Sequence, residues 1–229
     1  MNNTNSIKLD TKYVISYIDM LGTTARIRGN NSEASFFTIK NIYEQMINVF
    51  TTGGMEQEHI KVKIFSDNII IARQTAENVD AIVANLNQMI ALAATFQFFS
   101  MVSGWPVRGG ITIGDLYLDD TFVWGKGLLR SYELESKVAV APRIVIDPML
   151  KTEVLDKFTV HCWRKDAGLP IVDYLSMCHN EQTMETVKNP ILSLLKNSNE
   201  MTVGKIEWLK DDFNRACQEK QYHNLIIAD

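Results

Sequence analysis

Apolar and polar positions alternate in a way that predicts a strand followed by a helix at the start of the chain. Tyr13 to Ile18 is a β-branched and aromatic run, typical of a mostly buried strand, and it ends at Asp19. The small residues from Leu21 to Thr24 indicate a tight loop. From Ser32 to Phe50, apolar residues recur at the spacing of an amphipathic helix.

The middle of the chain predicts further strands and helices. Apolar positions alternate with lysines from Ile60 to Ile64, and a Ser-Asp-Asn turn separates this run from Ile69 to Ile71, so we expect a hairpin with Asp67 at or near its tip. The elements expected next are a helix over Val79 to Ala93, a strand over Val107 to Ile113, a helix over Lys126 to Val138 and a short strand over Arg143 to Ile146. This order is typical of a ferredoxin-like or palm-type α+β fold, a mostly antiparallel sheet covered by helices on one face.

The pattern weakens after Ile146. Phe158 to Trp163 and Ile171 to Leu175 are possible strands, and the spacing of apolar residues from Ile206 to Cys217 predicts a final helix. Nothing resembling a linker precedes this tail. We therefore expect a single domain over residues 1–229, with a core at about 13–146 and a C-terminal extension of the same domain at 147–229.

Composition narrows the range of functions. The chain has 229 residues, of which 46% are hydrophobic and 22% charged, as in soluble globular proteins. The net charge of −4 argues against a broad nucleic-acid surface, and so against a polymerase relative. The polar N-terminus has no signal-peptide pattern, and the apolar window from Met89 to Phe99 is too short to span a bilayer. We expect a cytoplasmic protein with reduced cysteines, no membrane partner and no nucleic-acid partner.

Two aspartates are candidate metal ligands. Asp19 ends the first strand, and Asp67 lies at the predicted hairpin tip. If the strand and the hairpin are neighbours, both carboxylates emerge at the same sheet edge and could bind one or two Mg²⁺ or Mn²⁺ ions. The alternative is that both are turn or cap residues, and spacing alone favours it.

A candidate phosphate loop directly follows Asp19. It consists of Leu21, Gly22, Thr23 and Thr24. A small-residue loop before a helix exposes backbone N–H groups that can bind phosphate oxygens, although an ordinary strand-to-helix turn has the same composition.

A glycine-rich strand is the third candidate segment. Gly109 and Gly110 follow Arg108. Glycines inside a strand indicate a close approach, either near a site or at a bulge or crowded helix-on-sheet contact.

Together these segments resemble the class III nucleotidyl cyclases. Tyr17 to Gly22 (YIDMLG) is similar to the first metal-binding segment of that family. Lys63 to Asp67 (KIFSD) resembles the second, in which a base-contacting lysine stands four residues before the second metal aspartate. Val107 to Gly114 and Val123 to Ser136 match two further signatures in the same order, so the resemblance runs from about residue 13 to 146.

The chain departs from that family at three functional positions. Phe122 stands where an adenine-reading aspartate is common, Leu129 at the position of the ribose-binding asparagine, and Glu133 at that of the transition-state arginine. With its late Ser131 to Ile144 segment, the variant pattern instead resembles the pyrimidine nucleotide cyclases of the bacterial antiphage Pycsar systems. Those enzymes make cyclic UMP or cyclic CMP as a second messenger for an effector.

The resemblance implies a mechanism and a homodimer with active sites at the subunit interface. The ribose 3′-hydroxyl would attack the α-phosphorus and release pyrophosphate. Two Mn²⁺ or Mg²⁺ ions would be held by Asp19, Asp67 and the carbonyl of Met20, while residues 21–24 would bind phosphates.

The resemblance does not directly identify the positively charged residue that replaces the family arginine, or the base of the nucleotide. Positive charge in place of the family arginine would come from Arg130 and Arg108. Lys63 can only donate, and uracil presents an acceptor where cytosine presents an amine, so UTP is favoured over CTP if Lys63 reaches the base.

Two other functions stay open. One is a purine nucleotide cyclase with a rearranged site, against which the replaced asparagine and arginine count. The other is a non-catalytic, cyclase-like module that binds a nucleotide or a partner. The two retained carboxylates, which repel each other, count against that module.

Overall fold

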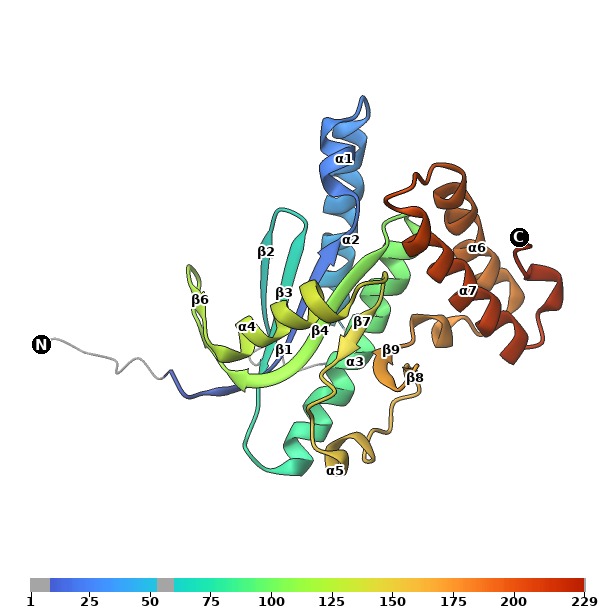
Figure 1. The fold of residues 1–229 in the computed structure, drawn as a ribbon. Helices are drawn as coiled ribbons and strands as arrows, with labels where there is room; N and C mark the ends of the chain where they lie inside the picture. The colour runs from blue at the N-terminus through green and yellow to red at the C-terminus, as the bar shows by residue number, and fades with distance from the viewer. Residues whose placement is uncertain (1–8, 53–59, 229) are drawn as a thin grey trace, which may run out of the picture.

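The computed structural model describes residues 9–52 and 60–228 (Figure 1). Its strands are β1 (Lys12–Met20), β2 (Ile60–Phe65), β3 (Asn68–Gln74), β4 (Val107–Asp115), β5 (Tyr117–Leu118), β6 (Val123–Trp124), β7 (Ile144–Ile146), β8 (Trp163–Asp166) and β9 (Leu169–Val172). Its α-helices are α1 (Thr23–Arg28), α2 (Ser32–Thr52), α3 (Val79–Val102), α4 (Lys126–Glu133), α5 (Thr152–Leu155), α6 (Glu181–Lys196) and α7 (Val203–Glu219). A π-helical turn, η2 (Leu134–Val138), continues α4, and two 3₁₀ turns are η3 (Tyr174–Met177) and η4 (His223–Leu225).

Seven strands form one sheet in the order β2-β3-β1-β4-β7-β9-β8. Among the strand pairs of this sheet in the described part of the chain, only β4–β7 is parallel. The predicted α+β fold with a mostly antiparallel sheet and helices packed on it is therefore confirmed. β1 lies between β3 and β4, and this central position explains its continuous apolar run.

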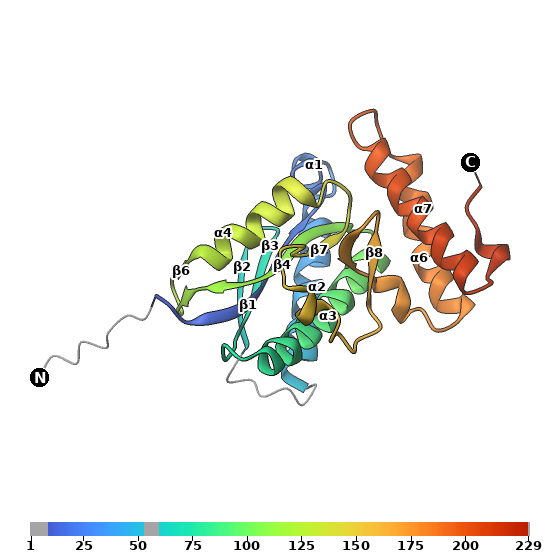
Figure 2. The same ribbon diagram turned by 60° about the horizontal axis from the view of Figure 1, so that its bottom comes forward.

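Helices cover both faces of the sheet, so the expectation of helices on one face is wrong. Val14 and Ile18 of β1 point into the main core with residues of α2 and α3. Ile15, whose side chain points to the opposite face of the strand, lies against α4 at Gly127. The strand alternates as predicted, but both of its faces are buried because α4 crosses the second one (Figure 2).

Close backbone approach between α4 and β4 explains the glycines of the VRGGITIG segment. A Cβ on Gly110 would lie 2.4 Å from the Cβ of Leu134 and 2.6 Å from the carbonyl oxygen of Ser131. A Cβ on Gly114 would lie 2.5 Å from the Cα of Gly127. Of the two interpretations of this segment, the crowded helix-on-sheet contact is the one observed at Gly110 and Gly114.

Several expected elements have different bounds. The loop after Asp19 continues into the short helix α1, and the helix expected over 126–138 becomes π-helical from Leu134. The strand expected over 158–163 is wrong, because Phe158 to Cys162 precede β8 as irregular chain. The strand expected over 171–175 ends at Val172 and gives way to η3. The β5–β6 hairpin and α6 were not predicted.

The C-terminal segment contributes to two parts of the fold. β8 and β9 join the main sheet through β7. The helices α6 and α7 build a second apolar cluster with η3, and this cluster meets the end of α3 at Met101. α7 contains the four apolar residues whose spacing predicted it, and all four are buried: Ile206, Leu209, Phe213 and Cys217.

One described helix, α3, has the length and apolar composition that a membrane span requires. In this fold it packs against the sheet, with Leu86, Ile90 and Phe96 fully buried in the main core. Asn78 caps its first turn by accepting a hydrogen bond from the N–H of Ala81 at 2.9 Å.

Candidate active site

The sheet brings the two predicted metal aspartates together. Asp19 pairs with Asn68, the residue after Asp67, in the β1–β3 ladder. The N–H of Met20 donates to the carbonyl of Asp67 at 3.1 Å. Ser66 adopts a left-handed conformation, with φ 56°, and with Asp67 it forms the tight turn that ends the hairpin at this edge.

The loop after β1 is ordered by two hydrogen bonds and by the backbone conformation of one glycine. The hydroxyl of Thr23 donates to the carbonyl of Met20 at 3.0 Å, which leaves that carbonyl a second lone pair for another ligand. Gly22 has φ 86°, a conformation that favours glycine. The N–H of Leu21 donates to Pro106 at 2.8 Å, so this amide is already used. Thr23 and Thr24 open α1, where the first N–H groups have no partner within the helix.

A third carboxylate lies beside Asp19 that the sequence did not reveal. Arg108 of β4 forms ion pairs with Asp19, at 3.3 Å from its Nε to Oδ2, and with Glu135 of η2. The Glu135 side chain is only 3% exposed. In the sequence, Glu135 is one of many charged residues in a predicted helix, and nothing there sets it apart. The π-helical turn that buries it beside Asp19 has no sequence signal. Such turns are frequent at functional sites.

Burial and mutual repulsion perturb these carboxylates. Burial raises the pKa of Glu135 to about 7, with the charge of Asp19 adding to the rise and Arg108 opposing it. Burial also raises the pKa of Asp19, and the nearby Asp67 acts in the same direction. Bringing cations to this site therefore stabilises it.

Lys63, the predicted base-contacting residue, lies on the same face of the sheet as Asp19. Its Nζ donates to the carbonyl of Asp120 in the β5–β6 turn. The strand register places Lys63 opposite Ile70, which itself pairs with Tyr17. From the strand spacings, the Cα atoms of Lys63 and Asp19 are about 12 Å apart.

A cavity of about 620 Å³ adjoins this row of residues. Its walls include Tyr17, Trp124, Leu128, Leu129 and Tyr132. The rings of Tyr17 and Tyr132 meet edge to face at 5.7 Å. The walls are largely aromatic and aliphatic, as is typical of sites for flat organic groups.

The three positions that depart from the family pattern have ordinary surroundings here. Phe122 is 54% exposed and stacks on Trp124 with ring centroids 6.4 Å apart. Leu129 lines the cavity and is 60% exposed. Glu133 forms an ion pair with Lys137 at 3.0 Å.

Arg130, a predicted catalytic cation, is held by the buried Asp147. Two parallel hydrogen bonds join its guanidinium to that carboxylate, at 2.6 and 2.9 Å. Thr112 donates to the same carboxylate at 2.7 Å. Arg130 thus links α4 to Asp147, the residue after β7. A catalytic role for Arg130 would require this ion pair to open.

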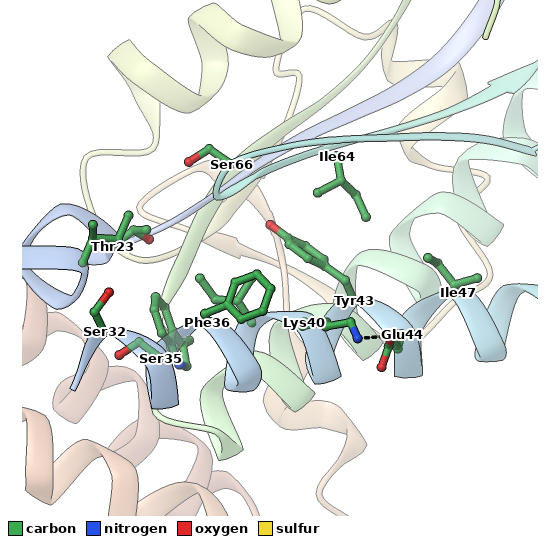
Figure 3. A pocket seen from close by; sticks show the side chains of 13 residues that line it. Thr23, Ser32, Ser35, Phe36, Lys40, Tyr43, Glu44, Ile47, Ile64 and Ser66 are labelled. Atoms are coloured by element: carbon green, nitrogen blue, oxygen red, sulfur yellow. Dashed lines mark ion pairs between the residues drawn. The ribbon is translucent and has the colours of Figure 1, made fainter. Parts of the chain in front are cut away.

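A second cavity, of about 500 Å³, lies under the hairpin on the opposite face of the sheet (Figure 3). Ile64 points into it from β2, and Phe36 and Tyr43 from α2. The Tyr43 hydroxyl points toward the hairpin and has no hydrogen-bond partner among the described residues. Burial raises the pKa of Tyr43, and the charges of Asp67 and Asp19 add to the rise.

The donor set fits a hard divalent ion. Asp19 and Asp67 supply carboxylate oxygens, and Met20 supplies a carbonyl oxygen beside them. Within residues 9–52 and 60–228, no three His, Cys, Asp or Glu side chains cluster as a metal site. Mg²⁺ commonly binds one or two carboxylates and takes its remaining ligands from phosphates and water, which matches this incomplete set.

Comparison with known proteins gives similarity of fold. No family model and no curated protein matches the chain. The adenylyl cyclase CyaB from P. aeruginosa is 16% identical over 71% of this chain and 94% of its own, with a TM-score of 0.49. The guanylyl cyclase domain of the RhoGC fusion protein from Blastocladiella emersonii is 12% identical over 59% of this chain and 79% of its own, with a TM-score of 0.44. A structure of adenylyl cyclases from Trypanosoma brucei is 14% identical over 76% of this chain and 94% of its own, with a TM-score of 0.42.

These solved structures are named for adenylyl or guanylyl cyclases.

Proposed function

We propose that this protein is a nucleotidyl cyclase that converts a pyrimidine nucleoside triphosphate, with UTP favoured and CTP possible, into its 3′,5′-cyclic monophosphate and pyrophosphate. The observation that carries the proposal is the meeting of Asp19 and Asp67 at one sheet edge, next to the loop that opens α1. As in the antiphage systems that the sequence resembles, the product would be a second messenger for a separate effector.

The residues of the site would divide the work as follows. Asp19, Asp67 and the Met20 carbonyl would hold two Mg²⁺ or Mn²⁺ ions, which lower the pKa of the 3′-hydroxyl and neutralise phosphate charge when bound. The first N–H groups of α1, at Thr23 and Thr24, would bind phosphate oxygens. Thr23 would also hold the loop in place through its bond to Met20.

The pyrimidine preference rests on the cavity beside Lys63. Leu129 lines this cavity, and Phe122 stacks on Trp124, which also lines it. These two apolar side chains stand in place of polar groups that would read a purine and its ribose. Lys63 supplies donors for the O4 of uracil. Since the family resemblance implies active sites at the subunit interface, we propose that Lys63 and Asp19 serve different active sites of a homodimer.

One observation favours a second candidate, a non-catalytic nucleotide-binding module. Arg108 already bonds the Asp19 carboxylate, and this ion pair competes with a metal ion for the same oxygen. In the cyclase, Arg108 must move toward Glu135 or the phosphates when the metal binds.

The test is to incubate the purified protein with ATP, GTP, CTP or UTP and Mn²⁺, and to identify products by mass spectrometry. We expect one cyclic pyrimidine monophosphate from the wild type and from Asp10→Ala, a control at an exposed carboxylate. Asp67→Ala should form none while retaining its circular dichroism spectrum. A cyclic purine would overturn the base assignment, turnover by Asp67→Ala would overturn the metal mechanism, and nucleotide binding with no product would favour the module.

A further inference from the structure

Helix α7 of the C-terminal segment packs against the turn that carries Glu135. Trp208 of α7 contacts an apolar cluster formed by Leu134, Ala139, Val145 and Ile171. The guanidinium of Arg143, which precedes β7, lies 5.7 Å from the Trp208 ring. These contacts hold α7 against this cluster.

Lys205 lies three residues before Trp208, so the two share a face of α7. The cluster against which Trp208 packs includes Leu134, which precedes Glu135 in the chain, so this face of α7 lies near the turn that carries Glu135. Consistent with that placement, burial raises the pKa values of Asp19 and Glu135, and the positive charge of Lys205 opposes the rise at both.

Among the residues that the structure describes, Lys205 has no ion-pair partner, unlike Arg108 and Arg130. Arg108 is paired with Asp19 and Glu135, and Arg130 with Asp147. Over residues 9–52 and 60–228, no carboxylate lies within 4.0 Å of the Lys205 ammonium, although the side chain is half-buried. A half-buried cation that acts on a carboxylate site without pairing with it is available to an anionic ligand.

We propose that Lys205 binds the triphosphate of the substrate, so that α7 supplies part of the active site. The inference rests on the proposed function, and it gives the C-terminal segment a role in the chemistry. The ammonium would supply positive charge that position 133, a glutamate, cannot. Trp208 would be a positioning residue that fixes α7 and with it Lys205.

The test is isothermal titration with inorganic tripolyphosphate, with and without Mn²⁺, which requires no turnover. We expect Lys205→Met to weaken binding about tenfold, the effect of losing one charge-assisted hydrogen bond. Lys205→Arg should retain most of the affinity. Lys196→Met removes the same charge from an exposed position at the end of α6 and should bind like the wild type.

Three results would overturn the inference. They are wild-type affinity in Lys205→Met, equal losses in Lys205→Met and Lys196→Met, and no binding of tripolyphosphate by the wild type. A thermal melt of each variant separates lost binding from lost folding, and a Lys205→Met variant that weakens binding only by unfolding also counts against it. Failure of the cyclase proposal has a different signature, since tripolyphosphate binding that depends on Lys205 would persist without any cyclic product.

Discussion

Glu135 is buried, and its ionised form is destabilised by the negative charge of Asp19 and stabilised by the positive charge of Arg108. A protonated Glu135 is neutral and needs no opposite charge beside it, whereas the ionised form depends on the positive charge of Arg108. Arg108 is in turn shared with Asp19. The protonation of one side chain therefore sets how much of the Arg108 charge remains for the candidate metal ligand.

This arrangement predicts that stability falls as the pH rises. The pKa of Glu135 is about 7 in the folded protein, against an ordinary value of 4.5, so the folded state binds the proton more tightly. Stability linked to that proton is present below about pH 4.5 and is lost as the pH passes 7. In metal-free buffer, we expect the wild type to lose roughly 2 to 3 kcal/mol of unfolding free energy between about pH 5 and 8 relative to Glu135→Gln. Urea melts across this range measure it, and parallel curves for the two proteins would contradict it.

At the scale of elements, the position of α4 is fixed by glycines. Gly110 and Gly114 of β4 and Gly127 of α4 let two backbones approach more closely than any side chain would permit. α4 then continues into the π-helical turn that carries Glu135. Packing at the glycines thus determines where a carboxylate of the site lies.

Gly110→Ala tests that dependence. The added methyl would lie 2.4 Å from the Leu134 Cβ, so we expect a loss of about 1 to 3 kcal/mol of unfolding free energy and a displaced Glu135. Gly204→Ala in α7 is the matched control, because its methyl meets no atom within 4 Å. The control should gain up to about 1 kcal/mol from helix propensity. Urea melts of both variants decide, and equal stabilities would refute the tight contact.

The elements that the sequence predicted are those with a long apolar period. β1, the β2–β3 hairpin, α2, α3, β4 and the apolar face of α7 follow from alternation or helical spacing, and the turn at Asp67 follows from its residue types. Elements fixed by tertiary contacts did not follow from pattern, among them α1, the two-residue strands β5 and β6, and η2. The meeting of Asp19 with Asp67 was predictable from strand ends. The positions of Glu135 and Lys205 near Asp19 could not be predicted, because each depends on packing between segments that are distant in sequence.

At the scale of the whole molecule, one apolar surface lies open around the larger cavity. Phe122, Trp124, Leu129 and Tyr132 are each between 47% and 63% exposed. Exposed apolar patches of this kind mark interaction surfaces. This patch lies on the face of the sheet that carries Asp19 and Lys63, where the proposed homodimer would form.

If the proposed homodimer forms through this patch, Leu129→Asp is expected to be a monomer. A charge in the centre of the apolar patch would be desolvated when two copies associate, and this desolvation opposes association. Sedimentation equilibrium of the wild type, Leu129→Asp and Met149→Asp measures the effect. Met149 is 78% exposed on another part of the surface and serves as the control. A monomeric wild type would contradict the dimer.

The cluster between α6 and α7 has a further consequence, for the kinetics of thiol reactivity. Cys178 and Cys217 are fully buried there, while Cys162 lies at the edge of the main core. Burial raises the pKa of Cys178 to about 12, so its reactive thiolate is scarce until the cluster opens. The two thiols therefore act as internal reporters, and their alkylation rates by iodoacetamide should measure how often α6 and α7 separate. If tripolyphosphate bridges α7 to the sheet through Lys205, adding it should slow the alkylation of both thiols and leave Cys162 unaffected.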